Sequence, residues 1–357
     1  MKKSKSSIVD KVISIFLLLS IVLSFGITSV GATYNNFNDV DVQETVISYV
    51  RNNLDLDIEI KDKINLYNLD DNIIAFAFIL SSGGYIISDL KGEIIQAYFE
   101  YTKTSDVFCD VVEETKIYYA GVDNYFIKKN SCMIDLFTGE EIEENIVSQL
   151  INNFEEISSK PVATSNSSSG ITPYAVTSKY MLANPLATIS YNPNNLICGS
   201  TAAAILLFYY DDYKDGNVLQ GLYESDRTGE TIIKFLAVPI NGGISDTSRG
   251  ATVSDIRDGL NIYFNSMNLK DYSAIADSRN LGFGYSNDFM NMIRSDKPFI
   301  LIFDDVEGSP RGHFYVVHGI LLDYGNGLYY VYCNNGYGSN NVFLSMKYAC
   351  NYVVLNK

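Results

Sequence analysis

Residues 192–210 read NPNNLICGSTAAAILLFYY and hold the most informative change of local character in the chain. A segment rich in proline and asparagine gives way at Cys198 to small and apolar residues that favour a helix. The pattern predicts that Cys198 stands at a helix N-terminus, where the dipole and unpaired N–H groups stabilise a thiolate. Such a thiol is nucleophilic near neutral pH. The alternative is a structural cysteine that fills space in a core.

The only two histidines of the chain lie in the β-like run GHFYVVHG at 312–319, and a later β-like run ends in CNNGYG at 333–338. A nucleophilic cysteine needs an imidazole as its partner, and the imidazole needs a third group to hold its orientation. A helix-borne Cys198 facing a strand-borne histidine and Asn334 would supply all three. The alternative makes the histidines hydrogen-bonded core residues and Asn334 a turn former.

The spacing of the two histidines leaves the choice between them open. A hairpin that turned at 325–327 would place His318 opposite Asn334, whereas a longer loop would restore the register of His313. Because the histidines are five residues apart, they would point to opposite faces of a regular strand, and only one could serve. We favour His313 and keep His318 as the alternative.

Residues 174–357 form one predicted domain of ordinary size, with a helical half followed by a β-rich half. Helical patterns come first, at 199–210, 253–267 and 287–295. Strand patterns follow, rich in aromatic and β-branched residues, at 298–303, 312–322, 328–333 and 342–345.

Residues 33–157 form a second, smaller α+β unit. One helix is predicted near 42–50, and strands are predicted at 73–80, 85–88, 93–99, 116–119 and 133–137. This unit has no histidine, and its carboxylates are scattered through polar stretches. No catalytic site is therefore predicted in it.

Two further segments frame these units. Residues 158–173, SSKPVATSNSSSGITP, are polar and contain two prolines, so they are predicted to be an exposed linker that a protease could cut. Residues 1–32 combine lysines, an apolar run at 12–27 and the small residues of VGA at 30–32, which predicts a signal peptide and a secreted, extracellular protein. A membrane anchor is the alternative, but the run is shorter than the ~20 residues a spanning helix needs.

Composition excludes several classes of function. The 357 residues are 47% hydrophobic and carry a net charge of −16, which repels nucleic acid and anionic lipid. Five cysteines without a CxxC motif, together with two histidines, make a zinc site improbable. We expect no cofactor, no nucleic acid partner, and no membrane contact once the signal peptide is removed.

The motifs also resemble a known family. NNLICGSTAAAILLFYY at 194–210, GHFYVVHG at 312–319 and YYVYCNNGYG at 329–338 resemble the papain-like cysteine peptidases of bacteria, especially the streptopain and bacteriocin-processing groups. AFAFILSSGGYIISDLKGEIIQAYF at 75–99 resembles the pro-domain of the streptopain family. The resemblance implies an α+β fold, with a helical half and an antiparallel β half, preceded by a small α+β pro-domain.

The same resemblance implies roles for individual residues. Cys198 would be the nucleophile, His313 the general base and acid, and Asn334 the orienting residue. Asn192 stands where these peptidases carry a glutamine that helps to form the oxyanion hole, together with the backbone N–H of Cys198. Tyr337 stands where they usually carry a tryptophan that shields the asparagine and histidine pair.

The implied activity is that of a secreted cysteine endopeptidase made as a zymogen. Its partners would be a protein or peptide substrate and its own pro-domain, with cleavage of the linker leaving a mature enzyme from about residue 174. Two alternatives remain. One is a peptidoglycan-directed cysteine hydrolase, and the other is a catalytically inactive binding or adhesion module, for which Asn192 and Tyr337 would be marks of lost activity.

Overall fold

The structure is a computed structural model that describes residues 39–100, 105–108, 115–160, 177–189, 197–243, 250–277, 286–303, 312–323 and 327–357. The chain divides into two compact units, Met1–Asp41 and Val42–Lys357, and nearly all described residues belong to the second. The predicted signal peptide, most of the predicted linker, the predicted start of the mature enzyme and Asn192 lie outside the described residues.

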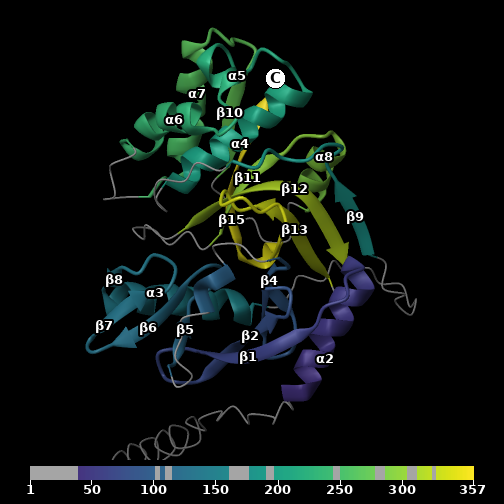
Figure 1. The fold of residues 1–357 in the computed structure, drawn as a ribbon, viewed down its shortest axis with the longest axis vertical. Helices are drawn as coiled ribbons and strands as arrows, with labels where there is room; N and C mark the ends of the chain where they lie inside the picture. Colours follow the sequence, from purple (N-terminus) through teal and green to yellow (C-terminus); the bar gives the residue numbers. More distant parts are fainter. Residues whose placement is uncertain are drawn as a thin grey trace, which may run out of the picture. The chain divides into compact units, whose positions relative to one another are not determined.

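One sheet, almost entirely antiparallel, runs through the second unit (Figure 1). Its described strands follow the order β10-β15-β11-β12-β13-β14-β4-β3-β2-β1-β5-β6-β7-β8, with β9 paired to β12. The pair of β1 and β5 is parallel, and every other pair between described strands is antiparallel. The described residues therefore have the predicted α+β character.

Helices precede most strands in the C-terminal part, as predicted. The helices are α4 Cys198–Tyr213, α5 Leu222–Ser225, α6 Glu230–Asn241, α7 Val253–Ser266, α8 Ser286–Arg294 and the 3-10 turn η5 Met346–Tyr348. The strands are β9 Thr177–Met181, β10 Ser273–Asp277, β11 Phe299–Phe303, β12 His313–Asp323, β13 Leu328–Asn334, β14 Val342–Ser345 and β15 Ala349–Asn356. The sequence did not predict α5, α6, η5, β9, β10 or β15.

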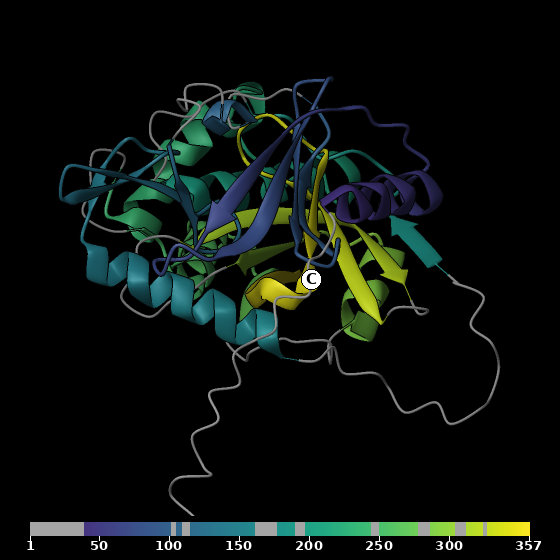
Figure 2. The same cartoon turned by 90° about the horizontal axis from the view of Figure 1, so that it is seen from below.

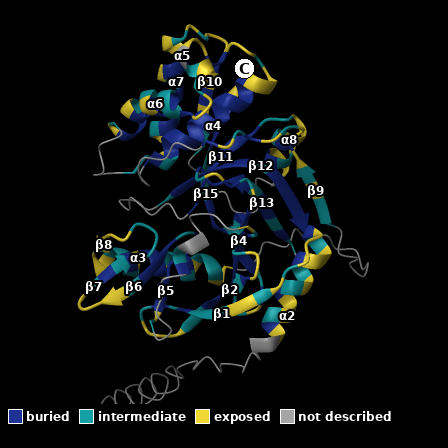
Figure 3. Cartoon of the chain, in the orientation of Figure 1, coloured by how far each residue is buried: buried dark blue, intermediate teal, exposed yellow. Residues whose placement is uncertain are grey.

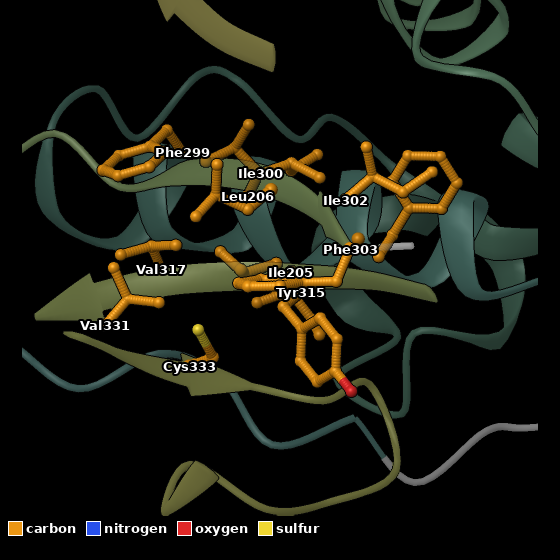
Figure 4. Packing of buried hydrophobic residues seen from close by; sticks show 14 of the residues in the cluster. Ile205, Leu206, Phe299, Ile300, Ile302, Phe303, Tyr315, Val317, Val331 and Cys333 are labelled. Atoms are coloured by element: carbon orange, nitrogen blue, oxygen red, sulfur yellow. The ribbon is translucent and has the colours of Figure 1, made fainter. Parts of the chain in front are cut away.

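Helix α4 is the centre of this part, and residues 199–211 of it are all buried (Figure 3). It packs against α6 and α7 on one side and against β11 and β12 on the other. Figure 4 shows Ile205 and Leu206 of α4 among the side chains of β11 and β12. The small residue Gly199 is required at its start, because an added Cβ would lie 2.9 Å from the Cβ of Ala251. The helix that carries Cys198 is thus held between α6 and α7 and the strands β11 and β12.

The N-terminal part contains helices at both ends and a meander between them. Helix α2 Asp39–Tyr49 continues as the π-helical turn η1 Val50–Leu54, and α3 Glu144–Ser159 closes the part, with the 3-10 turn η2 Ser105–Phe108 within it. The strands are β1 Ile60–Tyr67, β2 Ile73–Leu80, β3 Tyr85–Asp89, β4 Ile94–Tyr98, β5 Ile117–Tyr119, β6 Tyr125–Lys129, β7 Cys132–Asp135 and β8 Glu141–Ile142. The end of α3 includes Ser158 and Ser159, which the sequence analysis had assigned to the linker.

Candidate active site

Cys198 is the first residue of α4, as the sequence predicts. Its predecessor Ile197 has φ −94° and ψ 15° and provides no side-chain cap for the helix. The first N–H groups of α4 therefore keep their partial positive charge close to the half-buried thiol. The site begins with a cysteine whose anionic form is favoured by its own helix.

His313 is the first residue of β12, is only 8% exposed, and lies close enough to Cys198 for its hydrogen-bonding capacity and charge to lower the pKa of the thiol. Strand β12 packs against α4, so the antiparallel sheet brings the imidazole to the start of the helix. The backbone N–H groups of Phe314 and Gly199 also act to lower the pKa of the thiol. The helix, the strand and their packing together assemble the pair that the sequence analysis favoured.

The two groups shift each other's protonation in opposite directions. Burial alone raises the pKa of Cys198, but the hydrogen bond and charge of His313 outweigh it and bring this pKa below its ordinary value. Burial alone lowers the pKa of His313, but Cys198 outweighs that effect and brings this pKa above its ordinary value. The arrangement favours a thiolate beside an imidazolium.

The group that holds the imidazole is a backbone carbonyl. His313 Nε2 lies 2.9 Å from the carbonyl oxygen of Asn335. A neutral imidazole that donates from Nε2 to this oxygen carries its lone pair on Nδ1, which leaves Nδ1 available to the thiol. The carbonyl thus fixes both the orientation and the tautomer of His313.

The amide of Asn334 does not serve this purpose in the structure, contrary to the sequence prediction. Its Nδ2 donates to Asn340 Oδ1 at 2.6 Å, and its Oδ1 accepts from the N–H of Gly336 at 2.7 Å. The physical reason is that β13 ends at Asn334, so its side chain satisfies the turn that follows. The contact with His313 falls one residue later and comes from the main chain of Asn335.

His318 occupies a different place, although it lies on the same strand. The ladder pairs Val317 with Cys333 and Gly319 with Tyr332, so His318 is an extra residue at an irregularity of β12. Its Nε2 lies 2.8 Å from the carbonyl oxygen of Asn340. Burial lowers its pKa, and Lys179 adds to that effect. The structure brings His313, and not His318, to Cys198.

Tyr337 covers the imidazole. Its ring stacks on His313 with centroids 5.1 Å apart and an interplanar angle of 17°. Within the described residues its hydroxyl is buried without a hydrogen-bond partner. Burial raises its pKa strongly, and the charges of Cys198 and Asp123 act in the same direction. An aromatic ring therefore shields His313 at the position where the resemblance had suggested a tryptophan.

Asp123 is a site neighbour that the sequence analysis missed. It lies in the turn between β5 and β6 with φ 59°, and Tyr315 of β12 donates to its carboxylate. Tyr98 Oη donates to the same carboxylate at 3.2 Å, and Gln96 Nε2 does so as well. Tyr315 in turn meets His313 edge-on, with ring centroids 4.6 Å apart.

The charge of Asp123 also affects the protonation of His313, which Tyr315 separates from it. It is one of the causes, after burial and Cys198, that bear on the pKa of His313, and it raises this pKa. Sequence reasoning had dismissed the carboxylates of the N-terminal part as scattered. No local signal marks this one, because its partner Tyr315 lies 192 residues away in the chain.

The described part of the chain also bears on metal binding and membrane crossing. No group of three histidine, cysteine or carboxylate residues within it could hold a metal ion. Among its helices, none has the length and apolar character that a membrane crossing requires.

Comparison with known proteins returns only distant likenesses. No family model and no curated protein matches the chain. A mutant fragment of Prevotella intermedia prointerpain A is similar at 16% identity and a TM-score of 0.41, over 81% of this chain and 98% of that one. Active wild-type interpain A cysteine protease of the same organism is similar at 16% identity and a TM-score of 0.30, over 49% of this chain and 95% of that one. Likeness this low assigns no family to the chain.

Proposed function

We propose that the chain is a cysteine peptidase of papain-like fold, with Cys198 as nucleophile and His313 as general base and acid. The observation that carries this proposal is the placement of His313 beside Cys198 at the start of the buried helix α4, where each group shifts the pKa of the other. A thiol with a lowered pKa beside an imidazole with a raised one is the arrangement that nucleophilic catalysis by cysteine requires.

In the proposed reaction the Cys198 thiolate attacks the carbonyl carbon of a peptide bond, and a C–S bond forms as the carbonyl oxygen becomes an oxyanion. The imidazolium of His313 then gives its proton to the leaving amine, and the C–N bond breaks. A water molecule, deprotonated by the now neutral His313, attacks the thioester and releases the acid product. The leaving thiolate of Cys198 and the reprotonated His313 restore the ion pair.

Supporting residues hold this machinery. The carbonyl of Asn335 keeps His313 in one orientation, and Tyr337 excludes water from one face of the imidazole. Asn192, with the N–H of Cys198, is proposed to stabilise the oxyanion, as the family resemblance implies. The orienting role first assigned to Asn334 passes to Asn335.

The biological setting is proposed from the sequence. The signal peptide of residues 1–32 would direct secretion, and residues 33–157 would act as an intramolecular pro-domain. Cleavage in the linker at 158–173 would give a chain starting near residue 174. Substrates would be proteins or peptides.

Labelling of the signal-free chain tests the catalytic assignment. An epoxide peptide inhibitor is applied from about pH 4 to about pH 9, and mass spectrometry identifies the modified cysteine. We expect rapid labelling of Cys198 well below the ~8.5 pKa of a free thiol. An inert Cys198 in native, processed protein would overturn the assignment and favour a binding or adhesion module.

Substrate assays then separate the two enzymatic candidates. Cleavage of a denatured protein, with no loss of turbidity from bacterial cell walls, is the expected result for the peptidase. The converse result would identify a peptidoglycan-directed hydrolase. Cys198→Ala should abolish whichever activity is found.

A further inference from the structure

We propose that the N-terminal segment, defined as residues 42–160, stays bound to the C-terminal segment, residues 177–357, after the linker between them is cut. The product of cleavage would be a two-chain molecule, not a C-terminal segment on its own. This inference goes beyond the proposed function, and it holds whatever chemistry Cys198 performs, because it rests only on how the two segments pack.

The first observation is that the two segments share one sheet. Strand β4 of the N-terminal segment pairs with β14 of the C-terminal segment, with Val342 opposite Tyr98, Phe343 opposite Ala97 and Leu344 opposite Gln96. All of these positions are buried. Separation would turn both strands into edges and expose unpaired backbone N–H and C=O groups.

The second observation is a hydrophobic core to which both segments contribute. Tyr330 and Phe343 of the C-terminal segment are fully buried, at 0% exposure, and their rings stack at 4.6 Å. The ring centroid of Tyr49, in the N-terminal segment, lies 5.6 Å from that of Tyr330, and the ring centroid of Phe99, in the same segment, lies 6.4 Å from that of Phe343. The rest of this core comes from both segments: Val42, Val46, Val50, Leu54, Phe76, Phe78, Leu80, Ile86, Ile94, Ala97, Leu321 and Leu328.

The third observation is that the end of the N-terminal segment is anchored just before the linker. Phe154 of α3 stacks on Tyr348 of η5 with centroids 5.4 Å apart, and the two elements lie side by side in Figure 2. Lys347 Nζ donates to the carbonyl oxygen of Ser158 at 3.0 Å, and the hydroxyls of Ser158 and Tyr348 are 3.2 Å apart. A cut after residue 160 leaves all of these contacts in place.

The fourth observation is polar and lies beside the candidate active site. Tyr315 of β12 is fully buried and donates to the carboxylate of Asp123. Removal of the N-terminal segment would leave this phenol without that acceptor, which is costly for a buried hydroxyl. The buried strand pairing and the shared hydrophobic core resemble a domain core more than a transient contact, which favours lasting association of the two segments.

The test uses a chain in which Cys198→Ala prevents self-cleavage and a recognition site for a specific protease is inserted between residues 160 and 177. The protein is cut to completion and passed over a size-exclusion column in native buffer, at decreasing concentration. We expect the two fragments to elute together and to separate only in denaturant. Separate elution in native buffer would overturn the inference, whether the C-terminal fragment then stays folded or precipitates.

Two matched variants locate the interaction. Phe99→Ala removes a partly buried ring that contacts Phe343 across the interface, and Phe235→Ala removes a partly buried ring that contacts Tyr223 and Tyr263 within the C-terminal segment. Phe99→Ala should weaken association of the cut fragments by on the order of tenfold. Phe235→Ala should leave association unchanged. Equal effects of the two variants would contradict the proposed interface.

The outcome is independent of catalysis. Cut fragments that stay together, in a parent protein whose Cys198 reacts with iodoacetamide no faster than an unfolded thiol, would overturn the peptidase assignment and keep this inference. An active parent whose fragments separate would do the opposite.

Discussion

His313 and His318 lie on the same strand, β12, but differ in what their imidazoles can do. His313 Nε2 lies 2.9 Å from the carbonyl of Asn335, and His318 Nε2 lies 2.8 Å from the carbonyl of Asn340. Burial lowers the pKa of both. Only His313 has a thiol partner, and this partner reverses the net direction of its shift. A hydrogen bond to a turn carbonyl orients each imidazole. The presence or absence of a neighbouring thiol then decides whether the imidazole is stabilised in its protonated form.

Replacement of each histidine in turn should give the largest difference in activity between the two positions. His313→Ala removes the proton donor and the partner of the thiolate, so kcat/KM should fall by about 10³-fold or more. His318→Ala should change kcat/KM by less than about tenfold, because His318 does not contact Cys198. Peptide hydrolysis by the two purified variants is the measurement. A greater loss from His318→Ala would reverse the assignment.

The pH dependence of alkylation should also distinguish His313 from His318. The pKa of Cys198 is lowered and that of His313 is raised, and both shifts favour a thiolate beside an imidazolium. Labelling of Cys198 should therefore persist below the range of an ordinary thiol. With His313→Gln the thiolate loses this support, and the onset of labelling should move toward higher pH. His318→Gln serves as the matched control and should leave the onset in place.

Replacement of Asp123 should give a smaller effect on the same pair. Asp123→Asn removes a charge that raises the pKa of His313, so the imidazolium should lose its proton at lower pH. The alkaline limb of kcat/KM should move down by up to about one pH unit. Asp71→Asn is the control, because Asp71 lies in the same segment but pairs with Lys116. An unmoved alkaline limb would remove Asp123 from the electrostatics of the site.

The smallest expected effect concerns stability and His318. Because its folded pKa lies below the unfolded value, protonation is opposed in the folded protein. As pH falls below about 6.5, the unfolded chain takes up a proton that the folded chain resists, so the free energy of unfolding decreases. His318→Gln should lose this contribution. Urea unfolding at neutral and mildly acidic pH checks it, and an equal acid dependence in both proteins would contradict it.

Local sequence patterns reached a good part of the architecture. The polar sequence before Cys198 and the apolar run after it correctly predicted the start of α4, because helix propensity and dipole effects act over a few residues. The strands β11 to β14 followed from their aromatic and β-branched runs. Helix α3 was missed although Val147, Leu150, Ile151 and Phe154 are all buried at helical spacing, so that signal was present in the sequence.

Local sequence was enough to predict a cysteine at a helix start, two histidines in one strand, and an asparagine-rich turn after another strand. Tertiary structure decided which histidine meets Cys198, because the packing of β12 against α4 brings its first residue, His313, to the start of the helix. It also decided that a main-chain carbonyl of Asn335 orients His313. Every residue has a main-chain carbonyl, so no side-chain motif can predict which carbonyl makes this contact. The approach of Asp123 to Tyr315 joins residues 192 positions apart, and only the completed sheet brings them together.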